Sequence, residues 1–154
     1  RLRRVTSGGA RDTLIAAVLA GLIRWPQEIA RHAETLARSA SLDPRFMSLL
    51  DGLDSGEALE SGRIETILAR NGFAGPMPDE YSRIRYPFVC DDVDRGSAAE
   101  ALAAAIAKLF EEPLLDEAID LATSQFDFDE QQRLRKRKQD INDRMRRLTS
   151  ETQE

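Results

Sequence analysis

Cysteine and histidine are nearly absent from this sequence, which contains only Cys90 and His32. One cysteine cannot form an intrachain disulfide, and two such residues cannot supply the four ligands of a Cys/His zinc site. Cys90 precedes Asp91 and Asp92, whose negative charges oppose formation of a thiolate nucleophile. His32 has no serine or aspartate partner at a recognisable spacing. We therefore expect a chain that is not itself an enzyme and that holds no metal or other cofactor.

Long apolar runs are also missing. No stretch approaches the ~20 apolar residues that a membrane-spanning helix needs. The basic start, Arg1 to Arg4, is followed by Thr-Ser-Gly-Gly rather than by the apolar core of a signal peptide. With 42% hydrophobic and 32% charged residues, the composition is typical of a folded, soluble protein. We expect a cytoplasmic protein with no membrane contact and, because the first residue is not methionine, an excerpt of a longer chain.

Two further motifs are candidate ligand sites. Asp91, Asp92 and Asp94 could attract a divalent ion, but they lack the glycine and the distal glutamate of a calcium loop. Acidic residues just before a helix are explained by the helix dipole. The Ser7–Gly9 segment lacks the lysine of a phosphate-binding loop, so we interpret it as a flexible lead-in.

Apolar residues with helical spacing dominate the first half of the chain. Asp12 can cap a helix that ends at Trp25-Pro26, where a second helix begins. Asp43-Pro44 repeats the start signal, and a fourth helix over 57–70 ends at Asn71-Gly72. The first of these helices has the widest apolar face. Its apolar residues are Leu14, Ile15, Val18, Leu19, Leu22 and Ile23.

The second half begins with a change of composition. Residues 72–96 are rich in Gly, Pro and Asp and predict a long loop with a short extended piece at 84–89. Ser97 can cap an alanine-rich helix that Pro113 breaks or kinks, and a last helix spans about 129–148. No strand pattern competes, so the fold class is all-α. We expect a helical bundle of about five to six helices over 10–112, followed by a two-helix hairpin over 113–150.

Charge supports the hairpin. Residues 133–147 contain eight basic and two acidic side chains, a local balance of +6 in a chain whose net charge is −5. Residues 111–130 contain eight acidic side chains and no basic one. Antiparallel packing would place these opposite charges side by side and set the register of the two helices.

Phe126 and Phe128 lie at the predicted turn of this hairpin, between an acidic and a basic segment. Their spacing is too short for one helical face, so at least one ring should point outward. Exposed aromatic residues ringed by charge are typical of a protein–protein anchor. Three alternatives stay open: a nucleic-acid-binding module that uses the basic last helix, a solvated last helix that only closes the bundle with the phenylalanines buried, and a generic helical adaptor. Two observations argue against the binding of nucleic acid. The basic last helix has no interleaved aromatic residues that could stack on bases, and a protein with a pI near 5.1 would repel the phosphate backbone elsewhere.

Two stretches resemble a known family. Ala10 to Ile15, followed by Leu22-Ile23-Arg24-Trp25-Pro26, resembles the start of the C-terminal domain of bacterial DNA primase. Leu109 to Leu115, then Phe126-Asp127 and Gln131 to Arg135, resembles the end of that domain in alphaproteobacterial primases. The resemblance covers nearly the whole chain. The segments 54–62 and 75–94 depart from the family's pattern.

The resemblance implies a non-catalytic domain of a DNA-directed RNA polymerase, with its zinc-binding and polymerase domains elsewhere in the parent protein. It implies docking of the hairpin onto the N-terminal domains of the hexameric replicative helicase, at the bacterial replication fork. The bundle would modulate the helicase and could contact the tail of the single-strand DNA-binding protein, with little direct binding of nucleic acid. The predicted helicase-binding residues are Phe126, Phe128, Gln132, Leu134, Arg135, Lys138, Ile141, Met145 and Arg146.

Overall fold

The computed structural model describes residues 2–38, 43–54, 60–82 and 85–153, and in these residues it contains helices and no strand. The helical bundle and all-α class predicted from the sequence are thus confirmed for the described chain. The α-helices are α1 (Leu2–Arg24), α2 (Gln27–Arg31), α3 (Ala33–Arg38), α4 (Pro44–Asp54), α5 (Ser61–Arg70), α6 (Arg95–Ile106), α7 (Glu112–Ser124) and α8 (Phe128–Gln153). Two 3₁₀ turns, η2 (Pro78–Glu80) and η3 (Pro87–Val89), and one π-helical turn, η4 (Ala107–Glu111), complete the described elements.

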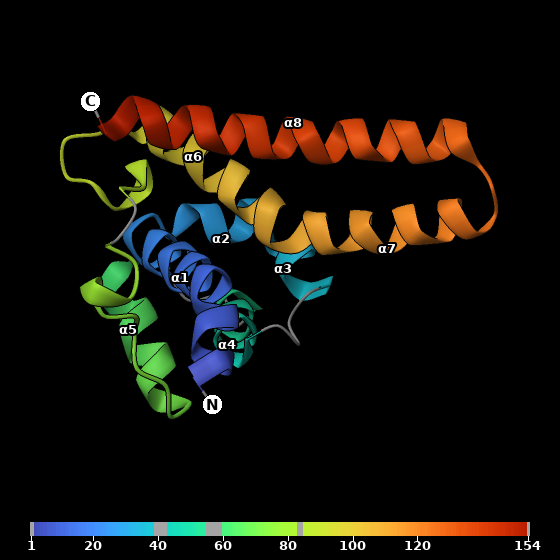
Figure 1. The fold of residues 1–154 in the computed structure, drawn as a ribbon. Coiled ribbons are helices and arrows are strands. Elements are labelled where there is room, and N and C mark those ends of the chain that lie inside the picture. Colours follow the sequence, from blue (N-terminus) through green and yellow to red (C-terminus); the bar gives the residue numbers. More distant parts are fainter. Residues whose placement is uncertain (1, 39–42, 55–59, 83–84, 154) are drawn as a thin grey trace.

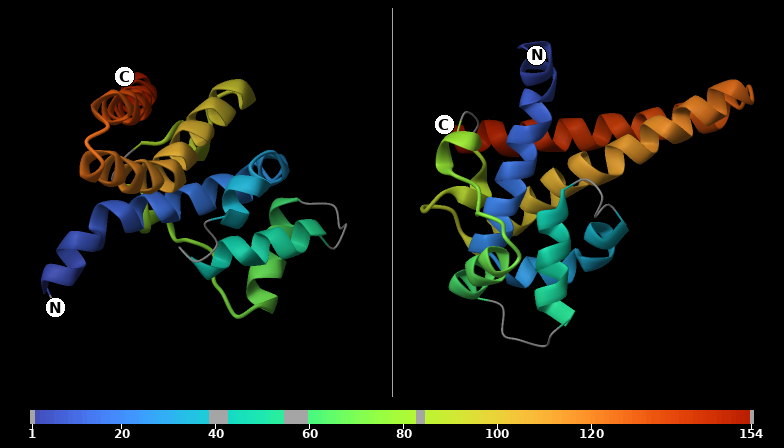
Figure 2. Two further views of the ribbon diagram at one scale, coloured as in Figure 1. Left: turned by 90° about the vertical axis from the view of Figure 1, so that its right-hand side faces the viewer. Right: turned by 90° about the horizontal axis from the view of Figure 1, so that it is seen from below.

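Three layers make up the molecule. Figure 1 shows α8 running along the nearly continuous α6–η4–α7 helix, with α1 to α5 on the other side of that helix. Figure 2 shows the same order from two further directions. The α7–α8 end of this arrangement projects beyond the bundle, as expected for a hairpin.

Several helix ends lie where the sequence placed them. α1 ends at Arg24, directly before Trp25-Pro26, and α4 begins at Pro44. α5 ends at Arg70, and Gly72 follows with a φ of 84°, a conformation that glycine adopts without strain. The backbone N–H of Phe73 then donates to the Leu68 carbonyl at 2.8 Å, which satisfies one of the last carbonyls of the helix.

Two predictions in the first half were wrong in detail. α1 begins at Leu2 rather than at Asp12, so Gly8 and Gly9 lie within a helix and are not a flexible lead-in. Each residue added to an existing helix gains a hydrogen bond without a new nucleation step. The helix can therefore continue through residues of low helix propensity, such as these glycines. The single helix expected after Pro26 is divided at His32, whose φ of −108° separates α2 from α3. Residues 57–59 of the fourth predicted helix lie outside the described residues.

The loop before α6 also differs from expectation. The extended piece predicted at 84–89 is wrong at its end, where Pro87–Val89 form the 3₁₀ turn η3; residue 84 lies outside the described residues, and the other turn, η2, comes earlier in the loop. The N-cap of α6 is Asp94 rather than Ser97: its carboxylate accepts the backbone N–H of Ser97 at 3.0 Å. Hydrogen bonds from the Ser97 side chain and backbone lower the pKa of Asp94.

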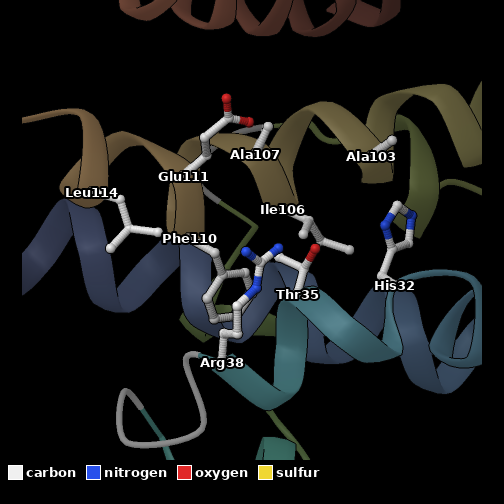
Figure 3. A pocket seen from close by; sticks show the side chains of 9 residues that line it. All are labelled: His32, Thr35, Arg38, Ala103, Ile106, Ala107, Phe110, Glu111 and Leu114. Carbon is white, nitrogen blue, oxygen red and sulfur yellow. The ribbon is translucent and has the colours of Figure 1, made fainter. Parts of the chain in front are cut away.

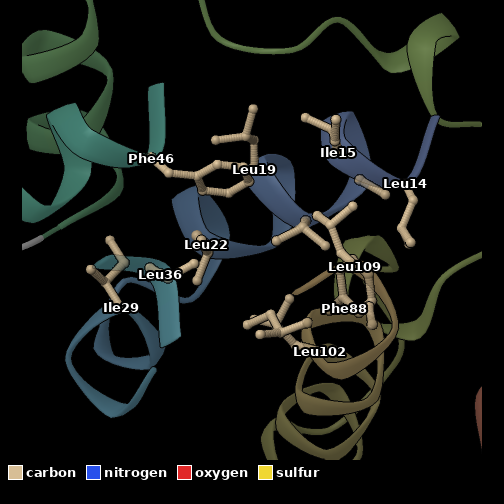
Figure 4. Close-up of a cluster of buried hydrophobic side chains, with 14 of the residues drawn as sticks. Leu14, Ile15, Leu19, Leu22, Ile29, Leu36, Phe46, Phe88, Leu102 and Leu109 are labelled. Atoms are coloured by element: carbon tan, nitrogen blue, oxygen red, sulfur yellow. The ribbon is translucent and has the colours of Figure 1, made fainter. Parts of the chain in front are cut away.

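The core includes part of this loop. Phe88 of η3 is fully buried, and the indole N–H of Trp25 donates to its carbonyl at 2.8 Å. A Cβ on Gly21 of α1 would lie 2.5 Å from the Phe88 ring, so this glycine permits the close approach of η3. Phe46 and Phe110 meet edge to face, with ring centroids 5.2 Å apart. Figure 4 shows how α1, the short helices and η3 contribute to this cluster.

Pro113 bends the long helix without ending it. The π-helical turn η4 lies immediately before α7, in which Pro113 is the second residue. Proline has no N–H to donate to the carbonyl one turn back, and its ring crowds that carbonyl. A π turn widens the helix locally and accommodates this missing hydrogen bond. The result is one helix whose first part packs on the bundle and whose second part forms the hairpin.

The hydrophobic interior falls into two clusters. The main cluster joins α1–α6, η3 and η4, and it includes Met145, with Leu148 packed against it. The second cluster lies within the hairpin and consists of Leu115, Ile119, Ala122, Leu134 and Ile141. The C-terminal half of α8 therefore packs on the bundle, whereas its N-terminal half packs on α7. Whether 10–112 and 113–150 are separable units stays a prediction.

Candidate functional site

In the turn between α7 and α8, a phenylalanine occupies the position just after the helix C-cap, where glycine is the usual residue. Phe126 has a φ of 58°, and it is the one non-glycine residue with positive φ in the described chain. The backbone N–H of Phe126 donates to Thr123, and that of Asp127 donates to Ala122 at 2.9 Å. These two bonds form the Schellman motif that closes a helix. A left-handed conformation is unfavourable for a residue with a Cβ, so stability does not explain this aromatic.

Both aromatic rings of the turn face solvent. Phe126 is 77% exposed and Phe128 is 59% exposed, which confirms the expectation that at least one ring points outward. Their centroids lie 6.4 Å apart with the planes at 70°, an edge-to-face pair. The turn thus presents two touching rings at the end of the molecule farthest from the bundle.

Polar contacts hold the turn in one conformation. Asp127 caps α8 by accepting the backbone N–H of Glu130 at 3.2 Å. The Gln131 amide donates to the Thr123 hydroxyl at 2.6 Å, which joins the two helices, and that hydroxyl donates to the Ile119 carbonyl. The two rings are therefore carried by an ordered turn and not by a loose loop.

Three predicted partner-binding residues lie inside the molecule. Leu134 and Ile141 are buried between α8 and α7, and Met145 is buried against the main core. In this conformation they cannot touch a partner directly. Their contribution is to hold the hairpin closed and to fix it to the bundle.

The remaining predicted residues are polar and surround a groove between α7 and α8. Arg135, Lys138 and Arg146 line this groove, which has a volume of about 880 Å³, whereas Gln132 is exposed nearer the turn. Lys138 pairs with Asp116 of α7 at 2.6 Å, a contact that raises the pKa of the lysine, and Arg146 pairs with Asp143 at 3.2 Å. Among the described side chains Arg135 has no ion-pair partner.

Opposite charges do lie side by side across the hairpin, as the sequence predicted. Besides the Lys138–Asp116 pair, Arg137 of α8 donates two hydrogen bonds to Glu111, at 2.7 and 3.0 Å. Deeper in the hairpin, Lys108 contacts Glu112 at 3.2 Å and donates to Asn142. These contacts set the register of α8 against the α6–η4–α7 helix.

The candidate catalytic and metal-binding residues are engaged in structural contacts. The Cys90 thiol donates to the Tyr86 carbonyl, and Asp94 caps α6. Asp91 pairs with Arg24 at 2.5 Å, and Asp92 pairs with Arg85 at 3.5 Å. The described part of the chain contains no group of three or more side chains suited to hold a metal ion.

The buried Glu28 and the partly buried His32 form a polar pair that the sequence did not reveal. The Glu28 carboxylate lies 3.8 Å from His32 Nε2 and 3.6 Å from Arg31. Burial lowers the pKa of His32, and the negative charge of Glu28 opposes that shift only in part. Within the described residues, neither Glu28 Oε1 nor His32 Nε2 has a hydrogen-bond partner. A glutamate on a short helix gives no sequence signal of burial, because burial depends on how α2 packs.

His32 also borders a pocket between α3 and the α6–η4–α7 helix. The pocket has a volume of about 410 Å³ and an apolar floor that includes Phe110. Figure 3 shows Arg38, Thr35 and His32 on one side of it and Phe110 and Leu114 on the other, with the Glu111 carboxylate pointing away from Arg38. No residue of this pocket was predicted as a site.

Comparison with known proteins gives no relative: no protein-family model, no curated protein and no solved structure matches this chain. None of the helices in the described ranges is both long and apolar enough to cross a membrane.

Proposed function

We propose that this chain is a non-catalytic docking domain of a bacterial DNA primase, which binds the N-terminal domains of the hexameric replicative helicase through its hairpin. The observation that carries the proposal is the pair of exposed rings, Phe126 and Phe128, held on an ordered turn at the end of a projecting hairpin. Support also comes from the sequence resemblance and from the arrangement of a helical bundle followed by a hairpin. The proposal assigns the chain to the bacterial cytoplasm, at the replication fork.

The function would be recognition rather than chemistry. A docked domain raises the local concentration of the attached polymerase at the fork and thereby couples primer synthesis to unwinding. It can also shift the conformational balance of the helicase if it binds one state more tightly. A contact between the bundle and the tail of the single-strand DNA-binding protein would be a further part of the same proposal.

Energy and specificity would be divided between two parts of the hairpin. Burial of an exposed ring in a partner's groove makes it a hot spot, worth about 2 kcal/mol or more on truncation. The basic groove residues Arg135, Lys138 and Arg146 follow one another along α8, from the half that forms the hairpin to the half that packs on the bundle. Charges at a rim act mainly on the association rate and on its salt dependence.

The test is size-exclusion chromatography of this chain with its cognate replicative helicase, followed by binding kinetics. We expect co-elution of the wild type and at least ~30-fold weaker binding of Phe128→Ala, through faster dissociation. Arg135→Ala should chiefly slow association. Met77→Ala is the matched control, because Met77 is an equally exposed apolar residue outside the hairpin. If the folded wild type does not co-elute, the proposed function is wrong.

The alternative is a nucleic-acid-binding module. It is favoured by four exposed basic residues of α8 that make no ion pair with a described side chain: Arg135, Lys136, Arg144 and Arg147. We expect only weak DNA binding at physiological salt, with a Kd no tighter than about 10⁻⁶ M. Fluorescence anisotropy with single- and double-stranded DNA measures this. Sub-micromolar binding with a steep salt dependence, lost in the Arg135→Ala/Lys136→Ala variant, would favour the alternative.

A further inference from the structure

The turn that carries Phe126 and Phe128 is acidic, although α8 as a whole is basic. Its acidic side chains lie in the turn and in the first turn of α8, and they are Asp127, Asp129 and Glu130. No lysine or arginine occurs from residue 109 to residue 132. The first cation of α8 is Arg133, whose guanidinium already donates hydrogen bonds of 2.8 and 2.7 Å to Glu130. The carboxylates beside the rings therefore leave an excess of negative charge at the turn.

Helix dipoles do not neutralise this charge. Acidic residues in the first turn of a helix are favoured by the partial positive charge there, and Asp127 caps α8 through the backbone N–H of Glu130. The C-terminus of α7 ends at the same turn, however, and carries a partial negative charge of similar size. The two helix ends thus largely cancel. Among the described residues, the exposed Asp129 carboxylate has no ion-pair or hydrogen-bond partner, so it is available to a partner molecule.

The exposed rings offer a second attraction for a cation. The face of a phenylalanine ring is negative, and a guanidinium or ammonium group within about 6 Å of the ring centre is attracted to it. Phe126 and Phe128 pack edge to face, an arrangement that leaves at least one face of each ring uncovered by the other. Asp129 follows Phe128 directly, so a cation over that ring would also lie near a carboxylate. Phosphate groups and anionic lipid headgroups would be repelled by the same charge.

We infer that the partner receives this turn in an apolar pocket whose rim carries arginine or lysine. The rings of Phe126 and Phe128 would fill the pocket, and a basic side chain at its rim would lie against a ring face and beside Asp129. The inference rests on the proposed function, because it takes the turn to be the docking part of the chain. It adds the chemistry of the surface that receives the turn.

A second copy of this chain is a poor match for that description. The groove between α7 and α8 is lined by three basic and three acidic side chains, and two of its cations are already paired within the chain. Its one large apolar lining residue, Ile119, is 9% exposed. The pocket beside α3 has a single cation, Arg38, for a turn in which both Asp127 and Asp129 lack one. The partner is therefore a different protein.

The first test uses two amphiphiles with the same eight-carbon chain, octylammonium and octanoate, each titrated into the ¹⁵N-labelled full chain. We expect octylammonium to shift the amide signals of Phe126, Phe128 and Asp129 at a concentration about threefold lower, or less, than octanoate needs. Asp129→Asn should reduce this preference. Asp51→Asn, which neutralises an exposed carboxylate on α4, is the matched control and should keep it. Equal shifts by both amphiphiles, or shifts only at residues away from the turn, would overturn the inference.

The second test measures the kinetics of helicase binding at two salt concentrations. Asp129→Asn should slow association about threefold and Asp129→Lys about tenfold, and both should reduce its salt dependence, because charges beside an interface steer association. Asp51→Asn should bind normally. Because Asp129 is exposed, both of its variants should stay folded, which circular dichroism checks. Unchanged or faster association of Asp129→Lys would overturn the inference.

The two proposals fail in different ways. A chain that co-elutes with the helicase but does not prefer octylammonium at the turn loses only the basic pocket. A chain that prefers octylammonium there without co-elution loses only the helicase role. Self-association of the chain that Phe128→Ala abolishes would make a second copy the occupant and overturn the inference.

Discussion

The guanidinium of Arg137 holds the carboxylate of Glu111 with two hydrogen bonds, across 26 residues of sequence. Glu111 is the last residue of the π-helical turn before Pro113, and Arg137 lies a third of the way along α8. The hydrogen bonds that Arg137 donates to Glu111 raise the pKa of Arg137. This pair joins the bend of the long helix to the helix that covers it.

We expect the Arg137–Glu111 pair to contribute modestly to stability. The two side chains are 53% and 37% exposed, so water and salt screen their attraction. A double-mutant cycle with Arg137→Gln and Glu111→Gln should give a coupling free energy of about 0.5 kcal/mol, falling toward zero at 1 M salt. Urea denaturation at two salt concentrations measures it. A coupling that does not change with salt would mean that the pair acts through geometry rather than charge.

Phe126→Gly should stabilise the fold while removing an aromatic ring. Glycine adopts the positive φ of this position freely, whereas a residue with a Cβ pays about 1 kcal/mol or more. Phe126→Ala keeps that cost, so the free energy of unfolding of the glycine variant should exceed that of the alanine variant by about 1 kcal/mol. Both should bind the helicase more weakly than the wild type. A glycine variant less stable than the alanine variant would show that this turn does not carry the strain.

Acidification should destabilise the fold through His32. Burial lowers the pKa of the folded imidazole below its ordinary value of 6.5, so the unfolded chain takes up a proton at a pH where the folded chain does not. The free energy of unfolding should therefore fall as the pH drops from about 7 to 5, before most carboxylates titrate. His32→Gln should flatten this part of the profile. A His32-dependent rise in stability on acidification would instead mean that the protonated imidazole pairs with Glu28 in the folded state.

A chain that ends at Glu112 should unfold cooperatively but at lower denaturant. Most of the main cluster lies before this residue, but the truncation removes Met145, which is buried in that cluster, and Leu148, which packs against it. Loss of these contacts should cost about 2–5 kcal/mol, and Met145→Ala in the full chain should account for much of it. Urea denaturation followed by circular dichroism measures both. Complete loss of cooperative unfolding would show that the hairpin is integral to the bundle core.

Local chemistry in the sequence determined many of the element boundaries. Trp25-Pro26, Asp43-Pro44 and Asn71-Gly72 mark helix ends in the structure because proline, short acidic caps and glycine act within one turn of the backbone. The charge blocks on both sides of Phe126 and Phe128 likewise predicted an antiparallel hairpin with outward rings. These features depend on neighbours close in sequence.

The tertiary structure alone decided which faces are covered. Phe88 is a core residue because η3 packs on α1, and Met145 belongs to the bundle rather than to the hairpin because α8 is long enough to return to it. Leu114 and Leu121 have the same local spacing as the buried Leu115 and Ala122, yet they stay exposed. Helical periodicity reveals an apolar face, but whether another element reaches that face depends on the lengths and crossings of helices far apart in the sequence.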